Sequence, residues 1–164
     1  MTEFNVCYPN EYRLEGVPYL VAYGRLQGLD GMIQFNFDPE HTGANRRLAF
    51  ATNNMPEHLA HWVVAAPLFL RGDVKEAPSL VTDNVTDKQI FSLPSYSDFI
   101  DKNDYLPLVT KVAKQEVPTE KSSDTEPFKK FYDSEKQLIT SETQELTLNK
   151  KRGIFKINTP KIQG

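Results

Sequence analysis

The amino-acid sequence predicts an α/β region over residues 1–75, followed by a β-rich region over residues 76–164. Two observations divide the chain at this point. Lysine is absent from residues 1–71 but occurs thirteen times after them, and ten of the eighteen aromatic residues lie in that first part. The apolar pattern also changes, from strands and long helices to short segments broken by Asp, Asn, Ser and Pro. We therefore expect two differently built domains, of which the second has the thinner core.

The first region contains four predicted elements in the order strand, helix, strand, helix, over residues 1–7, 11–28, 32–37 and 57–70. Both helices have apolar residues at spacings of three and four, and the second strand is apolar enough to be buried on both faces. Gly28 ends the first helix, while Pro56 opens the second helix and Gly72 caps it. Strands that are joined through a helix are typical of a parallel βαβ unit with a right-handed crossover.

The second region is predicted to consist of short strands and loops. Strands are expected over residues 89–93 and 106–112, with a short helix as the alternative at the start of the latter segment. Residues 118–127 form a polar loop of low complexity. Near the end of the chain, two alternating segments over 145–148 and 154–158 are joined by a polar link with a terminal glycine, and predict a β-hairpin.

Composition and charge exclude several classes of function. The net charge of −3 provides no positive field for a polyanion, so nucleic acid is not expected as a partner. The longest apolar stretch, residues 62–70, contains Pro67 and has about half the ~20 residues that a membrane-spanning helix needs. The first residues lack the basic start and the apolar segment of a signal peptide, and Cys7 is the only cysteine, so no internal disulfide is expected.

Glu3 is the main candidate for a catalytic residue. It lies at the end of the first predicted strand, and strand ends that face loops are where parallel α/β folds place catalytic groups. A carboxylate held there can attack an anomeric carbon or bind a cation, and a solvated or salt-bridged glutamate is the alternative. Phe4, Tyr8, Phe35 and Phe37 are candidates for stacking against sugar rings. Core packing is the alternative for these residues, and either Phe35 or Phe37 must take it.

Other polar residues have simpler explanations. Glu11 and Glu15 lie in the first turn of the predicted helix, where carboxylates suit the helix dipole. His58 and His61 are three residues apart on the second helix and have the spacing of a metal pair, but no third ligand follows at a suitable distance. We therefore predict no metal and no other cofactor. In Arg71-Gly72-Asp73, the glycine is explained as a helix cap and the arginine as a last-turn cation.

A series of short motifs runs in order along almost the whole chain. In the first region these motifs are Thr2-Glu3-Phe4-Asn5, Pro9-Asn10-Glu11-Tyr12-Arg13-Leu14-Glu15, Ala22-Tyr23-Gly24-Arg25-Leu26-Gln27, Asp30-Gly31 and Phe69-Leu70-Arg71-Gly72-Asp73-Val74. In the second region they are Ser141-Glu142-Thr143-Gln144-Glu145-Leu146 and Arg152-Gly153-Ile154-Phe155-Lys156-Ile157-Asn158-Thr159-Pro160. Together they resemble the C-terminal portion of bacterial retaining glycoside hydrolases that have a (β/α)8 barrel and two catalytic glutamates.

This resemblance implies a fold for each region. Residues 1–75 would be the last two βα units of a TIM barrel, and residues 76–164 would be part of an accessory β-domain. A complete barrel takes about 250 residues, so the upstream part of the barrel is an expected partner. The general-acid glutamate of such enzymes has no counterpart in this chain, which is therefore expected to be inactive alone.

The resemblance also implies roles for individual residues. Glu3 corresponds to the nucleophile of a double-displacement hydrolysis of O-glycosidic bonds. Asn5 and Tyr12 would help to orient the reacting sugar carbon, and Phe4, Tyr8 and Phe35 would line the sugar subsites. The substrate would be a carbohydrate, while the glycan and its linkage are not predicted.

Two alternatives stay open at this point. One is a noncatalytic carbohydrate-binding or structural module, and the other is a fragment without independent function. The sequence itself assigns no compartment. The resemblance implies action outside the cytoplasm, in a secreted or periplasmic protein whose export signal would lie upstream of Met1. Neither a membrane nor a nucleic acid is expected as a partner.

Overall fold

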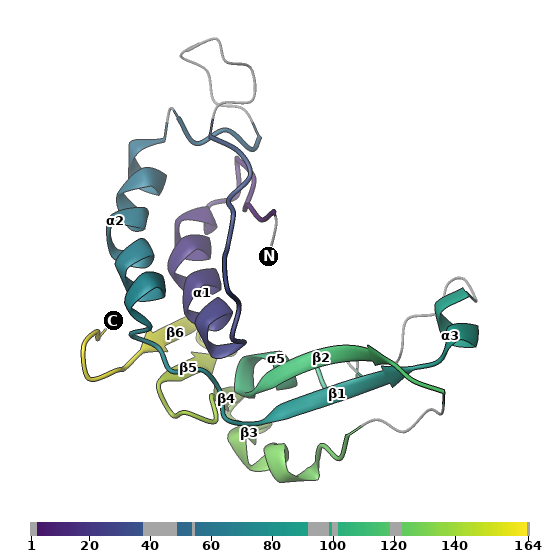
Figure 1. The fold of residues 1–164 in the computed structure, drawn as a ribbon. Helices are drawn as coiled ribbons and strands as arrows, with labels where there is room; N and C mark the ends of the chain where they lie inside the picture. Colours follow the sequence, from purple (N-terminus) through teal and green to yellow (C-terminus); the bar gives the residue numbers. More distant parts are fainter. Residues whose placement is uncertain are drawn as a thin grey trace. The chain divides into compact units, whose positions relative to one another are not determined.

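A computed structural model of the chain describes residues 3–37, 49–53, 55–91, 99, 102–118 and 123–163. The chain divides into two compact units, residues 1–74 and 75–164. The described part of unit 1 consists of two helices and irregular segments, and the described part of unit 2 contains all the strands (Figure 1).

Helix α1 (Arg13–Leu26) begins after a turn in which the Tyr12 N–H donates to Asn10 Oδ1 at 2.8 Å. The helix ends at Gln27, and Gly28 follows with a φ of +70°, a conformation that glycine adopts without strain. The predicted helix over residues 11–28 is therefore confirmed, with each end shorter by two residues. Its fully buried apolar residues are Val17, Val21, Ala22 and Leu26.

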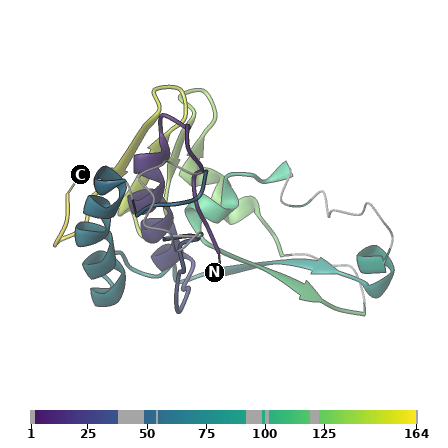
Figure 2. The same cartoon turned by 90° about the horizontal axis from the view of Figure 1, so that it is seen from above.

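Helix α2 (Pro56–Arg71) is confirmed together with both of its predicted end signals. Pro56 is its first residue, and Gly72 caps it with a φ of +63° and an N–H that donates to the Leu68 carbonyl. The two helices pack side by side, as two views show (Figures 1 and 2). Arg13, which is buried, joins them through a hydrogen bond from its Nη2 to Glu57 Oε1 at 2.6 Å.

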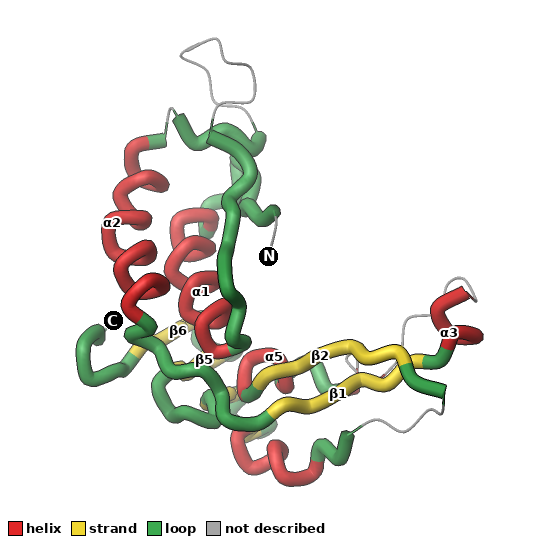
Figure 3. Tube along the Cα trace, viewed as in Figure 1, coloured by secondary structure: helices red, strands yellow, loops and turns green. Residues whose placement is uncertain are grey.

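The predicted strands over residues 1–7 and 32–37 meet at one parallel bridge, between Phe4 and Gln34. The Phe4 N–H donates to the Ile33 carbonyl at 3.2 Å, and its carbonyl accepts from the Phe35 N–H at 2.9 Å. The described remainder of both segments is irregular, so the prediction of continuous strands is wrong (Figure 3). Isolated two-stranded pairs are only marginally stable, and no described strand flanks this pair.

The described residues of unit 2 form two sheets. Strands β1 (Leu80–Val85) and β2 (Lys111–Glu116) pair in parallel, with Leu80 opposite Lys111 and Val85 opposite Glu116. The second sheet is antiparallel, with the strand order β3 (Tyr132–Asp133), β4 (Leu138–Thr140), β5 (Leu146–Asn149) and β6 (Ile154–Ile157). The core of this unit is a cluster of Val81, Tyr105, Leu106, Val109 and Ile139.

Strand β1 was not predicted, because Asp83 and Asn84 are typical of a loop. In the structure, Val81, Asp83 and Val85 alternate with less buried residues, and the Asp83 side chain is almost fully buried. Its Oδ2 lies 3.6 Å from the ammonium nitrogen of Lys114, the residue that is paired with Asp83 in β2. The charge that disfavours a strand locally is therefore compensated from the neighbouring strand.

The predicted strand over residues 89–93 is wrong in its described part, because Asp87–Phe91 forms helix α3. Residues 92–93 lie outside the described ranges. The Ile90 N–H donates to the Thr86 carbonyl at 3.0 Å, as in a helical turn that starts beside an acidic residue.

The segment over residues 106–112 divides into helix α5 (Leu106–Val109) and the first residues of β2, so the alternative of a short helix is confirmed for its first part. Of the predicted polar loop, residues 119–122 lie outside the described ranges. Its last two residues belong to the 3₁₀-helix η1 (Glu126–Phe131), which corrects the loop boundary.

The C-terminal hairpin is confirmed. Leu146 of β5 pairs with Ile157 of β6, and Asn149 pairs with Ile154. The link between the strands is held by the Arg152 N–H, which donates to Asn149 Oδ1 at 2.9 Å. Gly153 ends the link at a φ of +61°, which requires the conformational freedom of glycine.

Candidate active site

The two segments around the Phe4–Gln34 bridge have one side against the helices. On this side, the Phe4 ring lies 6.2 Å from the Trp62 ring of α2, measured between centroids. A Cβ atom at Gly16 of α1 would lie 2.6 Å from Val6 Cγ2. Glycine at this position therefore permits the first segment to approach the helix closely.

The opposite side of the same segments is open. Glu3, which precedes the bridge by one residue, is exposed, and so are Ile33 (63 %), Phe35 (41 %) and Phe37 (62 %). The predictions that the segment over residues 32–37 is buried on both faces, and that either Phe35 or Phe37 packs in the core, are therefore wrong. Alternation of side chains beside the bridge explains why Glu3, Ile33 and Phe35 are separated from Phe4, but it does not extend to Phe37, because the chain bends at residues 35 and 37. We call Glu3, Asn5, Ile33, Phe35 and Phe37 the open face.

Asn5 holds the open face together. Its Nδ2 donates to the Phe50 carbonyl at 2.8 Å and also to the Phe35 carbonyl. The Phe50 carbonyl accepts a second bond from the Asn36 N–H at 3.0 Å. Asn5 thus connects three segments that are distant in the sequence. The Phe35 and Phe50 rings meet edge to face, with centroids 6.0 Å apart.

Tyr8 and Tyr12 lie on the loop that leads into α1. The Tyr8 N–H donates to the Ala49 carbonyl at 2.8 Å, and its exposed ring lies under the Arg13 guanidinium, 5.4 Å from the carbon to the ring centroid. The Tyr12 side chain is 64 % exposed. The structure therefore brings Asn5 and Phe35 into contact, adds Phe50 to them, and places Phe4 on the helix side.

A chain of three polar side chains on the helix side was missed by the sequence analysis. Trp62 Nε1 donates to Gln34 Oε1 at 2.5 Å, and Gln34 Nε2 contacts His58 Nε2. We call Trp62, Gln34 and His58 the relay. Two signals indicate it in the sequence: Gln34 is one of two polar residues inside an apolar segment, and His58 and Trp62 are four residues apart on one helix face.

His58 is the most buried member of the relay, with 2 % of its surface exposed. Burial lowers its pKa, since a charged imidazole loses its hydration there, and the positive charge of Arg13 and the neighbouring His61 lower it further. Glu57 acts in the opposite direction. Within the described ranges, no group of three or more His, Cys, Asp and Glu side chains is arranged to hold a metal ion.

In unit 2, the carboxylates of the motif over residues 141–146 have structural partners. Glu142 Oε1 accepts from Ser79 Oγ at 2.6 Å, and its Oε2 accepts from Thr110 Oγ1 at 2.8 Å. Glu145, which is buried, accepts from the Lys75 N–H at 2.7 Å through Oε2. Both glutamates therefore fasten the first residues of the unit to its antiparallel sheet.

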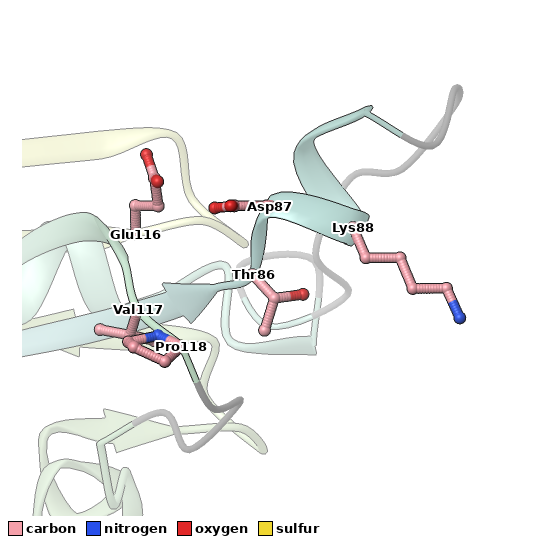
Figure 4. A pocket seen from close by; sticks show the side chains of 6 residues that line it. All are labelled: Thr86, Asp87, Lys88, Glu116, Val117 and Pro118. Carbon is pink, nitrogen blue, oxygen red and sulfur yellow. The ribbon is translucent and has the colours of Figure 1, made fainter.

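A pocket of about 430 Å³ opens at the carboxyl ends of β1 and β2, and Figure 4 shows the residues that line it: Thr86, Asp87, Lys88, Glu116, Val117 and Pro118. The pKa of Glu116 is raised, because its carboxyl group shares a hydrogen bond with Asp87 and experiences the charge of that residue. The Lys88 side chain points away from both acids. Two exposed acids do not by themselves define a ligand, so we assign no function to this pocket.

Comparison with known proteins gave no matching family model, no matching curated protein and no matching solved structure. In the part of the chain that the structure describes, no helix has the length and apolar character needed to span a membrane.

Proposed function

We propose that this chain carries the nucleophile-bearing part of a retaining glycoside hydrolase, with Glu3 as the nucleophile. The observation that supports the proposal is the open face, on which an exposed carboxylate accompanies exposed aromatic rings. The order of short motifs that resemble such enzymes supports it as well. A sugar ring stacks on aromatic side chains through its apolar face, while a carboxylate beside it reaches the anomeric carbon.

The chemistry requires two carboxyl groups. A Glu3 carboxylate oxygen would form an ester bond to the anomeric carbon while the glycosidic C–O bond breaks, and water would then hydrolyse the ester. In retaining enzymes a second carboxylic acid, about 5 Å away, protonates the leaving oxygen. In this proposal the second acid comes from a segment outside the present sequence.

Two residues take different roles in this proposal from those that the resemblance implies. Both hydrogen bonds from the Asn5 amide go to main-chain carbonyls, so Asn5 would position Phe35 and Phe50 rather than contact the sugar directly. Phe4 packs against Trp62, so the stacking rings would be the exposed rings of Phe35, Phe37 and Tyr8.

A noncatalytic carbohydrate-binding module is the second candidate. The same open face supports it, since stacking on Phe35 and Phe37 needs no second carboxylate. The two functions differ in whether Glu3 forms a covalent bond to the sugar.

The test uses activated glycosides that do not need a general acid. A panel of 2-deoxy-2-fluoroglycosides with dinitrophenolate leaving groups is incubated with the chain, and peptides are mapped by mass spectrometry. We expect one sugar ester on Glu3 and none in Glu3→Gln. A label on Glu11 or Glu15, or no label at all, would contradict the catalytic proposal.

Binding separates the two candidates. Phe35→Ala should weaken binding of the glycan that gives the best label at least 10-fold, whereas Phe91→Ala, which removes a more exposed ring in unit 2, should leave binding unchanged. Glycan binding that depends on Phe35 without any label would support the noncatalytic module. Absence of both binding and label would exclude the two together.

A further inference from the structure

The hydrogen-bond polarity of the relay is fixed by Trp62. The indole Nε1–H is a donor only, so the atom of Gln34 that faces it must be the amide oxygen. The amide NH₂ of Gln34 then faces His58 Nε2. This nitrogen must therefore accept the bond, and the proton of the neutral imidazole must be on Nδ1.

We propose that the relay is a pH-sensitive latch, which opens when His58 is protonated and releases the segment over residues 32–37 from helix α2. An imidazolium ring has an N–H at both nitrogens, so its Nε2–H would face the NH₂ group of Gln34. Rotation of the amide would relieve that conflict, but it would place NH₂ against the Trp62 N–H. No arrangement of the three side chains satisfies all the donors once His58 carries a charge.

Charged and titratable groups on two helices act on His58, and their balance opposes its protonation. Arg13 of α1 contributes a positive charge, which Glu57 of α2 partly neutralises at 2.6 Å from Arg13 Nη2. His61 follows one turn later on α2. Within residues 3–37, 49–53 and 55–74, His58 Nδ1 is buried and has no hydrogen-bond partner. The charged ring would therefore gain neither a counterion nor an acceptor.

The direction of the pH effect follows from linkage. The pKa of His58 is lower in the folded protein than the value of about 6.5 in an unfolded chain, so the unfolded state binds more protons between the two values. The stability contributed by the latch is fully present above about pH 6.5 and decreases as the pH falls toward the folded-state pKa. The proposal does not depend on the carbohydrate chemistry of the open face.

Trp62 provides the readout, because it is the only tryptophan of the chain. We expect the fluorescence of the full chain to change on acidification below about pH 6.5. His58→Gln should abolish this change, since a glutamine oxygen accepts from Gln34 at every pH. His61→Gln is the matched control on the same helix and should keep it. Persistence of the change in His58→Gln would overturn the proposal.

Gln34→Glu distinguishes the latch from a general loss of packing. A carboxylate accepts from both the Trp62 N–H and an imidazolium N–H, so the latch stays closed in acid. The fluorescence change should move to lower pH, while the titration of His58 itself, followed by NMR, moves upward by about 1 pH unit or more. A shift of the fluorescence change and of the His58 titration in the same direction would contradict the latch.

One measurement needs no variant. Two-bond correlations between the ring nitrogens and carbon-bound protons identify the histidine tautomer in the wild-type chain. At pH 7.5 we expect His58 to be neutral with its proton on Nδ1. A neutral ring with its proton on Nε2 would overturn the proposal, even if every variant failed to fold.

Discussion

The described parts of the two units use different side chains to form their buried hydrogen bonds. Unit 1 uses a neutral relay of tryptophan, glutamine and histidine, and leaves one side of its extended segments open. Unit 2 uses carboxylates, Glu142 and Glu145, that accept from hydroxyl groups and main-chain N–H groups of the same unit. The donors to these carboxylates all belong to unit 2, whereas the open face of unit 1 exposes apolar residues that a ligand or another segment would have to cover.

The largest expected effect tests the closed core of unit 2. Leu106, which is fully buried, belongs to the cluster with Val109 and Ile139. Leu106→Ala should reduce the free energy of unfolding by about 2–5 kcal/mol, because it removes buried methyl groups and leaves a cavity. Denaturant unfolding monitored by circular dichroism measures this. Leu70→Ala is the control in unit 1, where the side chain is 82 % exposed, and should change stability by no more than about 0.5 kcal/mol.

The next effect tests whether the hydrogen bonds of Glu142 to Ser79 and Thr110 stabilise unit 2. Glu142→Ala leaves the main-chain N–H and the hydroxyl of Ser79 without their acceptor, while the Thr110 hydroxyl keeps the Ser79 carbonyl. Each buried group without a partner costs about 1–3 kcal/mol, so the free energy of unfolding should fall by that amount or more. Glu135→Ala, which removes an exposed acid from the same unit, is the control. Equal stabilities of the two variants would show that the hydrogen bonds contribute nothing.

Gly16→Ala tests how residues 3–8 pack on α1, because the packing decides whether the substitution lowers or raises the free energy of unfolding. Alanine favours a helix over glycine by about 1 kcal/mol. If Val6 lies against the helix, however, the new Cβ overlaps with a stiff side chain, and we expect a net loss of about 1 kcal/mol or more. Gly31→Ala meets no atom within 4 Å and serves as the control. A stabilised Gly16→Ala variant would mean that residues 3–8 do not pack on α1.

The smallest effect concerns the acids at the ends of β1 and β2. Glu116→Gln keeps the hydrogen bond to Asp87 but removes the repulsion between the two charges. Because the pKa of Glu116 is raised in the fold, the repulsion destabilises the protein above that pKa and disappears as the pH falls through it. We therefore expect a small rise in melting temperature at pH 7 that vanishes in acid. Lys88→Met is the control, because the Lys88 side chain points away from both acids, and it should show no such rise in melting temperature.

The elements predicted best from the sequence are those with local signals at their ends. Pro56 and Gly72 define α2, and alternation with a polar link defines the hairpin of β5 and β6. Strand β1 was missed because the partner that compensates Asp83 is Lys114, which is distant in the sequence. Local patterns carry no information about such a partner.

The candidate site was predicted only in part, for the same reason. Glu3, Asn5 and Phe35 were identified as candidates, and the structure places Asn5 against the Phe35 carbonyl. Phe50 was not identified, since it follows a segment without regular spacing and reaches the site through main-chain contacts. Gln34 was interpreted as one residue of an apolar strand, although its amide contacts Trp62 and the buried His58 on α2. The catalytic role of Glu3 stays a prediction.

The parallel pairing of β1 with β2 has a consequence for the order of folding. The hairpin of β5 and β6 closes a link of only a few residues, whereas β1 and β2 pair only after residues 86–110 have been brought back to the start of the unit. The entropy lost in closing a longer loop slows the formation of non-local pairs. In pulse-labelled refolding, the main-chain amides of β6 should therefore become protected from exchange before those of β2. The C-terminal hairpin would then exist before β1 and β2 pair.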